Sequence, residues 1–404
     1  MKNFKLTRKL IMGAAAACIL SVSLNSCKDD EEEPVKPIEQ NSLNTIRVST
    51  NITSDVTWTK DNVYLLTGRI SVENGATLTI NAGTVIKGEA GTGVNASVLV
   101  VARGGKIAAN GKAAEPIIFT SADDQITSGS IASPNLDPDQ NGKWGGLIIL
   151  GKAPISASTP EAQIEGIPTS DANGLYGGTD SNDNSGVLNY VSIRHGGTNI
   201  GSGNEINGLT LGGVGSGTSI SNIEVVGNQD DGIEWFGGSV NVTNALVWNV
   251  GDDGIDTDQG WKGTLDNFVV ITVAGHSFEL DGPEGSANGS HTIKNGTVVA
   301  SDVANMNFSR DLINTDAKSQ VSLENIHISG IGANQQINRT VDNPLVLFTN
   351  VTLHVVPADL GNYIADASSK AGISASTTAN ATGKANILAF TWTWAANAGK
   401  TTGL

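Results

Sequence analysis

The sequence contains little cysteine and few aromatic residues, and no stretch has the pattern of a long amphipathic helix. Two cysteines occur in 404 residues, and aromatic residues make up 5% of the chain. Cys18 lies in an N-terminal apolar stretch expected to be removed, so the mature chain keeps Cys27 alone and an intramolecular disulfide is excluded. Phosphate-binding loops, nucleophile elbows and redox motifs are missing too. These absences exclude disulfide-rich folds, helical bundles and the enzyme classes that depend on those motifs.

Glycine and acidic residues are abundant instead. The chain has 49 glycines, and 40 acidic residues outnumber 24 basic ones to give a formal net charge of −16. Loss of residues 1–26 would remove four basic residues and no acidic ones, which leaves −20. Such a charge repels nucleic acid and excludes it as a partner, whereas cations and neutral or basic partners are favoured. High glycine content with few aromatic residues indicates a turn-dense, all-β solenoid.

The first 44 residues have the pattern of a targeting segment and a linker. Residues 1–26 combine a basic start with an apolar stretch over 10–22, which is short for a membrane span. The sequence LNSC at 24–27 resembles a bacterial lipobox and predicts lipidation of Cys27; an unlipidated free cysteine is the alternative. The acidic run at 28–33 resembles the surface-export signal of Bacteroidetes lipoproteins. That resemblance implies an outer-membrane, lipid-anchored protein facing the cell exterior. The composition predicts residues 27–44 as linker and 45–404 as one domain.

A near-repeat of 22 and 23 residues organises the chain between residues 222 and 283. Asparagines precede short apolar strands at Asn222, Asn244 and Asn267. The second strands of the same units have the same spacing, with anchors at Ile233, Ile255 and Phe278. A fixed period of this length, with two short strands and turns in each unit, predicts one coil of a parallel β-helix stacked on the next.

Period-2 alternation assigns the two faces of each strand. The prediction places three pairs inward: Ile223 and Val225, Ala245 and Val247, Phe268 and Val270. It places Glu224, Leu246, Val269, Val226, Trp248 and Ile271 outward. The asparagine anchor continues at Asn295, Asn325 and Asn350, which predicts an internal ladder in which each amide bonds the next coil.

Polar insertions and caps complete the predicted solenoid. Residues 122–141 and 169–186 are polar and predict loops that leave the coils. Residues 45–60 predict a cap on the first coil. Residues 387–394 alternate Leu388, Phe390, Trp392 and Trp394 with small or polar residues, which predicts a final strand as the C-terminal cap.

Five short segments of the sequence resemble those of a known family. They are GATLTI at 75–80, KWGGLIILG at 143–151, IEGIP at 164–168, YVSIRHGG at 190–197 and DGIEWFGG at 231–238. Together they resemble a family of Bacteroidetes outer-membrane lipoproteins with a right-handed parallel β-helix. The resemblance covers most of the mature chain and implies fold and location, because the family has no settled activity.

Acidic residues recur on three neighbouring coils. The repeat aligns Glu234, Asp256 and Glu279, and two positions later it places Asp258 and Asp281 in one column. At the preceding turn, Asp230 and Asp231 align with Asp252 and Asp253, and His276 follows in the third coil. Like charges one coil apart repel, so a bound cation or raised pKa values must accompany this ladder.

Three interpretations of the ladder remain open. The Asp-Asp-Gly sequences could build turns with solvated side chains, or the carboxylates could bind Ca²⁺, which prefers hard oxygen ligands. The third is glycan cleavage, because the layout resembles that of polygalacturonases, with Asp231, Asp252 and Asp253 as general acid and base and His276 in support. The Arg-x-Lys motif of those enzymes is missing here. Trp144, Trp235 and Trp261 could stack on sugar rings, although strand parity places Trp235 in the core.

The sequence as a whole predicts a surface-exposed, lipid-anchored right-handed parallel β-helix that acts as a binding or structural module. A glycan or another extended surface ligand, such as a surface protein, is the expected partner because long solenoid faces suit polymers. A polysaccharide-cleaving enzyme is the alternative.

Overall fold

The computed structural model describes residues 44–200, 206–300, 311–332, 335–338, 343–365, 371–377 and 384–404. Residues 43–404 form one compact unit. The expected targeting segment, Cys27 and the linker up to residue 43 lie outside the described residues. Among the described helices, none is both long and apolar enough to cross a membrane.

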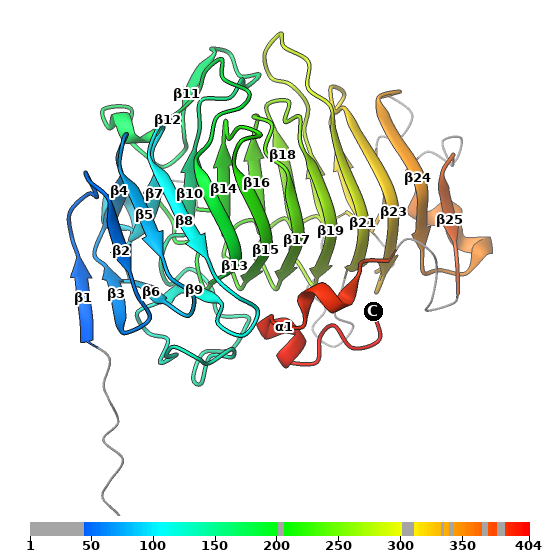
Figure 1. Cartoon of the computed structure of the whole chain (residues 1–404). Helices are drawn as coiled ribbons and strands as arrows, with labels where there is room; N and C mark the ends of the chain where they lie inside the picture. The colour runs from blue at the N-terminus through cyan, green and yellow to red at the C-terminus, as the bar shows by residue number, and fades with distance from the viewer. Residues whose placement is uncertain are drawn as a thin grey trace, which may run out of the picture. The chain divides into compact units, whose positions relative to one another are not determined.

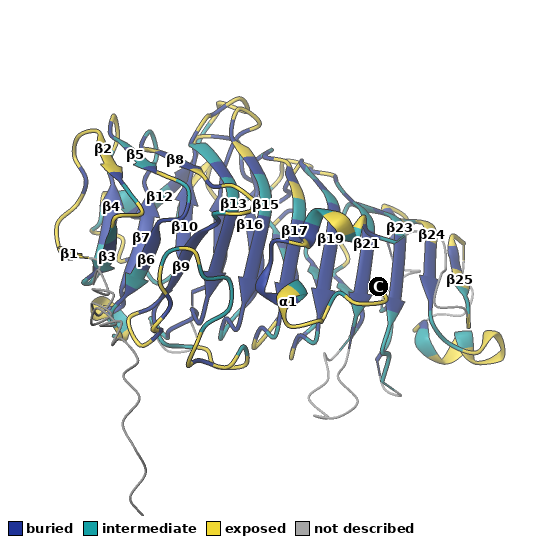
Figure 2. Cartoon of the chain, turned by 60° about the horizontal axis from the view of Figure 1, so that its bottom comes forward, coloured by how far each residue is buried: buried dark blue, intermediate teal, exposed yellow. Residues whose placement is uncertain are grey.

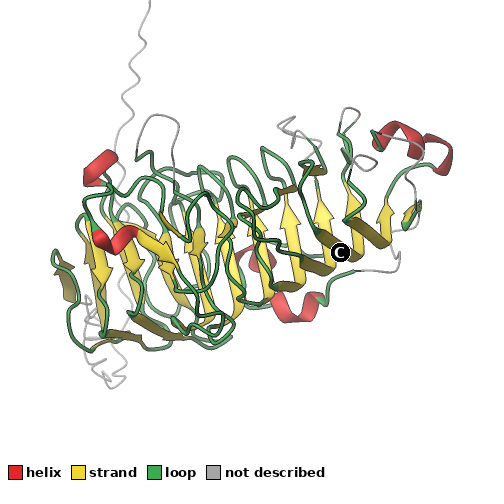
Figure 3. Cartoon of the chain, turned by 90° about the horizontal axis from the view of Figure 1, so that it is seen from above, coloured by secondary structure: helices red, strands yellow, loops and turns green. Residues whose placement is uncertain are grey.

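The fold is a right-handed parallel β-helix, as the repeat predicts, and Figures 1 and 3 show its strands stacked in rows. The larger sheet runs in the order β1 (Asn44–Val48), β3 (Asn62–Leu66), β6 (Val85–Gly88), β9 (Ile117–Ser121), β13 (Gly186–Arg194), β15 (Ser219–Val226), β17 (Val242–Trp248), β19 (Thr264–Ile271), β21 (His291–Val299), β23 (Val321–Ser329), β24 (Val346–Leu353) and β25 (Ile373–Ala375). A branch of this sheet joins β13 through β2 (Val56–Trp58), β5 (Thr77–Ile80) and β8 (Lys106–Asn110).

A second sheet forms the opposite side of the coils. It contains β4 (Arg69–Val72), β7 (Val98–Val101), β10 (Leu147–Leu150), β14 (Leu209–Gly212), β16 (Ile233–Phe236), β18 (Ile255–Asp258), β20 (Phe278–Leu280) and β22 (Ile313–Thr315). The short strands β11 (Glu161–Gln163) and β12 (Leu175–Gly177) pair antiparallel beside it. The helical turns are η1 (Gly93–Asn95), η2 (Ala172–Gly174), η3 (Pro357–Tyr363), η4 (Ile387–Phe390) and α1 (Trp394–Asn397).

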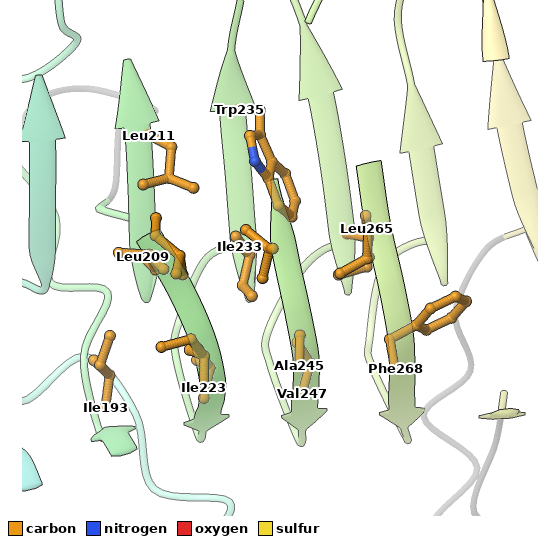
Figure 4. Close-up of a cluster of buried hydrophobic side chains, with 14 of the residues drawn as sticks. Ile193, Leu209, Leu211, Ile223, Ile233, Trp235, Ala245, Val247, Leu265 and Phe268 are labelled. Atoms are coloured by element: carbon orange, nitrogen blue, oxygen red, sulfur yellow. The ribbon is translucent and has the colours of Figure 1, made fainter. Parts of the chain in front are cut away.

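In-register stacking builds the core, as Figure 4 shows. Ile223, Ala245 and Phe268 are successive register partners, and each is at most 1% exposed. Side-chain volumes compensate along the stack, because small residues flank the large Phe268 ring. Gly296 follows Phe268 in register, and a Cβ there would lie 1.9 Å from the Phe268 ring. The predicted inward positions are confirmed.

The asparagine anchors lie at a bend within the long strands rather than before them. Asn222, Asn244 and Asn267 have φ values of +55°, +59° and +60°, in the left-handed region that asparagine tolerates better than most residues. Residues ahead of each anchor, such as Val242 and Thr243, already pair with neighbouring coils. Each unit has the two strands that the repeat predicts, but the first of them begins before its asparagine and covers two faces of the coil.

The predicted amide ladder is confirmed with one interruption. Asn222 donates to Asn189 (2.7 Å), Asn244 to Asn222 (2.9 Å) and Asn267 to Asn244 (2.6 Å). Asn325 donates to Asn295 (3.2 Å) and Asn350 to Asn325 (3.0 Å). Asn295 instead donates to the Asp266 carboxylate (2.7 Å), so a charged acceptor replaces the amide at that coil.

The insertion at 122–141 is held to the coils by the buried carboxylate of Asp124. It accepts hydrogen bonds from Thr120 (2.8 Å), from the Ile126 backbone (2.9 Å) and from Ser133 (2.8 Å). The second excursion, at 169–186, contains η2 and β12, so part of it returns to pair with β11. Both insertions leave the stacked coils, as predicted.

The C-terminal segment (384–404) corrects the prediction of a final strand. Its residues form η4 and α1, and they pack across the outward face of the central coils instead of extending the solenoid. Figures 1 and 2 show α1 beside the β15–β19 region. The outward residues Leu246, Trp248 and Val269 are at most 1% exposed because Phe390, Trp394 and Ala395 cover them. Apolar outward positions require such a cover, which strand parity alone does not reveal.

A buried ion pair lies under the same segment. Arg194 and Glu224 approach to 3.5 Å with side chains 1% and 0% exposed. The backbone N–H of Ala395 donates to Glu224 Oε1 at 3.0 Å, and the Arg194 guanidinium lies 4.9 Å from the Trp394 ring centre. These contacts compensate for burial of the two charges and fix the C-terminal segment on the coils.

We expect Trp394→Ala to reduce the free energy of unfolding by about 3–5 kcal/mol, the usual cost of removing a buried Trp side chain. Leu388→Ala, in the same segment, removes a side chain that is 80% exposed and should change stability by less than about 0.5 kcal/mol. Urea unfolding followed by fluorescence measures both. Equal effects of the two substitutions would contradict the packing described for this segment.

Candidate functional site

The acidic ladder lies on the second sheet, across β16, β18 and β20. Glu234 pairs in register with Asp256, and Asp256 pairs with Glu279. The column begins with Thr210 on β14 and ends with Asn314 on β22. The predicted alignment of the three acidic residues is therefore confirmed.

A second column lies where the chain enters these strands. Backbone hydrogen bonds link the coils here; for example, the Gly232 N–H donates to Asp253 O at 2.8 Å. The column contains Asn207, Asp231, Asp253, His276 and Asp311, each two residues before the first core-facing residue of the following strand. Gly232 leaves room for this close approach, since a Cβ there would lie 2.4 Å from Val247. The Asp-Asp-Gly sequences thus build the turn and bring acidic side chains together.

Two groups of carboxylates in the site overlap at one residue. One oxygen from each of Asp230, Asp231 and Asp252 lies within 4.8 Å of the other two. The same holds for Asp231, Glu234 and Asp256, so Asp231 belongs to both groups. The backbone N–H of Asp253 donates to Asp231 Oδ1 at 2.9 Å and fixes this shared carboxylate. Asp252 is exposed, which leaves the site open to solvent at that side.

Burial makes the ionised form of these carboxylates unfavourable. Burial, followed by repulsion from Asp256 and Asp230, raises the pKa of Asp231 well above its ordinary value. For Glu234 the causes that raise the pKa are burial and then the charge of Asp231. The pKa of Asp256 is raised by burial and then by Glu234 and Glu279 on the neighbouring coils. The site therefore either binds protons or needs a compensating cation at neutral pH.

Asp253, His276 and Glu279 form a third group. The His276 Nδ1 atom lies 3.1 Å from Asp253 Oδ1 and 3.9 Å from Glu279 Oε1, and the His276 backbone N–H also donates to Asp253. Burial opposes ionisation of Asp253, but hydrogen bonds from His276 and Glu279 outweigh it and hold the pKa of Asp253 below its ordinary value. Burial and the bond to Asp253 raise the pKa of Glu279 to about 8. The environment therefore lowers the pKa of Asp253 and raises that of Glu279.

Asp258 and Asp281 lie further along the strands. Burial and then the charge of Glu284 raise the pKa of Asp258 to about 7. The Asp281 backbone N–H donates to Thr257 O at 2.8 Å, as register requires. Neither residue joins the three carboxylate groups found among the described residues, so the structure does not bring these two candidates into the main site.

Amide side chains at both ends of the site escaped the sequence analysis. The Asn207 side-chain amide donates to the Glu234 carboxylate, while its Oδ1 atom is buried and has no hydrogen-bond partner in the described part of the protein. At the other end, Asn314 donates to Glu279 (3.3 Å) and accepts from Asn338 (2.6 Å). The signal for Asn207 is present in the sequence, because Asn207-Gly208-Leu209 matches Asp231-Gly232-Ile233 one coil later.

The proposed aromatic platforms are absent from the described surface. Trp144, Trp235 and Trp261 are at most 1% exposed, so the expectation that they stack on sugar rings was wrong. Trp235 and Trp261 stack on each other inside the coils with ring centres 4.6 Å apart. The core position predicted for Trp235 from strand parity is confirmed.

The geometry suits a cation better than a general acid and base on either side of a sugar. Clustered carboxylate oxygens are the ligands that Ca²⁺ prefers, and a buried amide oxygen such as that of Asn207 is of the same hard type. One ligand atom from each residue of a group lies within 4.8 Å of the others, close enough for a single ion to contact all three.

Comparison with known proteins identifies one family. Residues 50–399 match the family model described as a pectate-lyase like beta helix domain. No curated protein and no solved structure matches the chain.

The raised pKa values predict a pH dependence of stability. Without a divalent cation, the folded site holds protons that the unfolded carboxylates release above about pH 4.3. Its contribution to stability is therefore present at low pH and is lost as pH rises through the pKa of Glu279, about 8. In chelator, we expect the melting temperature to fall between about pH 5 and pH 8, and Glu279→Gln to flatten this slope. Glu324→Gln, outside the ladder, should leave the slope unchanged; a melting temperature that rises with pH would overturn the account.

Proposed function

This chain belongs to the pectate-lyase-like beta helix domain family, and we propose that it is a cation-dependent glycan-binding module. The bound ion is a divalent cation of the Ca²⁺ type, held by the acidic ladder. The glycan is an extended polymer that carries acidic groups.

One observation carries the proposal: two carboxylate groups on adjacent coils share Asp231. Asp230 and Asp252 complete the first group, and Glu234 and Asp256 complete the second. Their mutual repulsion and burial are costly unless positive charge compensates them. A divalent cation supplies that charge at neutral pH without protonation of the site.

A cation also accounts for how so acidic a chain could bind an acidic polymer. With a net charge of −16, the protein repels polyanions unless an ion bridges the two partners. The exposed Asp252 places part of the ladder at the surface, where a ligand carboxylate could complete the coordination. A long, regular solenoid face presents the extended surface that a polymer requires.

Attachment to the outer membrane is part of the proposal. Cys27 in the lipobox-like sequence would carry the acyl chains, and the acidic run at 28–33 would direct the module to the cell exterior. The resemblance to Bacteroidetes surface lipoproteins supports this location. Display outside the cell would place the ladder where both Ca²⁺ and polysaccharide are available.

Polysaccharide cleavage is the second candidate, favoured by the group of Asp253, His276 and Glu279. A carboxyl with a raised pKa beside one with a lowered pKa provides a general acid and a general base. In this arrangement Glu279 would donate the proton and Asp253, paired with His276, would accept one. Among the described residues, the tryptophans considered for the walls of a substrate cleft are buried, and binding is therefore the preferred function.

The cation is tested by calorimetry and thermal unfolding. Ca²⁺ should raise the melting temperature, because a ligand that binds only the folded state adds about 2.7 kcal/mol at 100 times its Kd. Asp256→Asn should remove most of this gain, whereas Glu324→Gln, outside the ladder, should retain it. Absence of a Ca²⁺ effect on the unsubstituted protein would refute a cation site.

The same preparations separate binding from cleavage. Binding predicts that a uronic-acid polymer is retained in Ca²⁺ but not in chelator, without new reducing ends. Release of reducing sugar that is abolished by Asp253→Asn, with an unchanged melting temperature, would establish the enzyme instead.

The anchor is tested separately in cells. Cys27→Ser should move the protein from the membrane to the soluble fraction, because the acyl chains supply about 0.8 kcal/mol of membrane affinity per buried methylene. Metabolic labelling with a fatty-acid analogue should mark the unsubstituted protein alone. Unchanged fractionation without any label would contradict lipidation.

A further inference from the structure

A chain of hydrogen bonds runs across successive coils into the group of Asp253, His276 and Glu279. It begins at the backbone N–H of Thr315 on β22, which donates to Asn338 Oδ1 at 2.8 Å. Asn338 Nδ2 donates to Asn314 Oδ1 at 2.6 Å, and Asn314 Nδ2 lies 3.2 Å from His276 Nε2. On the other side of the ring, His276 Nδ1 lies 3.2 Å from Asp253 Oδ2. The chain therefore links a backbone donor to a carboxylate.

The backbone N–H of Thr315 fixes the direction of every bond that follows it. A backbone N–H can only donate, so the atom of Asn338 that faces it is the amide oxygen. The NH2 group of Asn338 then donates to Asn314 and to the Asp311 carboxylate, which lies 3.1 Å away. Asn314 presents its oxygen to Asn338, and this leaves the NH2 group of Asn314 facing the His276 ring. Rotation of either amide would place two donors or two acceptors in contact.

This direction determines which ring nitrogen of His276 carries the hydrogen. Nε2 faces an NH2 group and must accept, so the hydrogen of the neutral ring is on Nδ1. Nδ1–H then donates to Asp253. The second hydrogen of the Asn314 NH2 group is donated to Glu279 Oε1 at 3.3 Å. Both ring nitrogens and both amide hydrogens are thereby paired.

Protonation of the ring does not change the role of Nδ1. Burial lowers the pKa of His276, but the hydrogen bond to Asp253 and the nearby carboxylate charges outweigh it and raise the pKa above its ordinary value. The protonated ring carries a hydrogen on both nitrogens, Nδ1 included. In either state Nδ1 has no free lone pair, although it is the ring nitrogen nearest the carboxylates of Asp253 and Glu279.

We propose that Asn314 and Asn338 are positioning residues that keep His276 from binding a metal, and so make the acidic ladder selective for cations that prefer oxygen ligands. Asp253, His276 and Glu279 otherwise offer one nitrogen and two oxygens within 4.8 Å of one another. Zn²⁺ favours imidazole nitrogen, whereas Ca²⁺ favours carboxylate oxygen. A histidine that binds Zn²⁺ directs its other N–H to an acceptor, but His276 directs Nε2 to a donor. The inference rests on the proposed function, because it concerns which cation the ladder holds.

Ring ¹⁵N spectra of the whole protein in chelator, with no metal present, test this arrangement. His276→Gln identifies the His276 signals among those of the five histidines. Above its pKa, the ring should carry its hydrogen on Nδ1 and leave Nε2 unprotonated. Asn314→Asp replaces the NH2 group with an acceptor and should place a hydrogen on Nε2, and Asn338→Ala releases the Asn314 amide and should give both tautomers. A neutral ring protonated on Nε2 in the unsubstituted protein, a result that needs no variant to fold, would overturn the proposal.

Titration calorimetry with Ca²⁺ and with Zn²⁺ measures the choice of cation. Asn314→Asp supplies the acceptor that a zinc-binding histidine needs, and should raise the affinity for Zn²⁺ relative to Ca²⁺ by about 10–100-fold. The ratio is the readout because an added charge strengthens the binding of both ions. The gain should disappear when His276→Gln is added to this variant.

Asn362→Asp is the matched control, because it adds the same charge to the exposed surface of η3 and should leave the ratio unchanged. Ca²⁺ binding by the unsubstituted protein with the same ratio in Asn314→Asp would overturn this inference alone. Absence of any Ca²⁺ binding by the unsubstituted protein would refute the proposed cation site and the selectivity with it.

Discussion

In-register stacking of coils is the constraint on which the rest of this structure depends. Parallel strands place equivalent residues of successive coils side by side, about 4.8 Å apart. A residue at a given position in one coil therefore contacts the residues at the same position in the coils before and after it. Apolar residues gain from this arrangement, as the Ile223, Ala245 and Phe268 stack does, and asparagines bond one another. Carboxylates lose from it, so the Glu234–Asp256–Glu279 column is a local departure from what the fold favours.

In-register stacking also determines the outer surface that the C-terminal segment covers. An outward row of Leu246, Trp248 and Val269 forms a continuous apolar strip because the coils are stacked. A segment more than a hundred residues later covers that strip and buries Arg194 with Glu224. Where the row becomes polar, at Thr297 and His327, the same segment leaves a pocket. One covering element therefore stabilises the central coils and closes a pocket beside them.

Much of the fold and the acidic ladder could be predicted because the repeat is nearly invariant between residues 222 and 283. Spacings of 22 and 23 residues determine which carboxylates become neighbours, and the register of Asp256 follows from that spacing. Asn207 and Asn314 were missed because the coils that contain them are irregular in length. The burial of Trp248 could not be predicted, since the residues that cover it are remote in sequence. The bend at Asn244 was misplaced because a left-handed residue inside a continuous strand leaves no break in the alternation.

The asparagine ladder determines which changes in length the solenoid can tolerate. Asn244 donates to Asn222 on the preceding coil and accepts from Asn267 on the following one, and Asn222 and Asn325 also donate backward and accept from the next asparagine. Removal or duplication of one complete coil would join an equivalent donor to an equivalent acceptor and preserve the ladder. Insertion of a single residue within a strand would move the asparagine off the bend and reverse the face of every side chain after it. The fold can therefore evolve in steps of whole coils, with finer variation confined to the loops between strands.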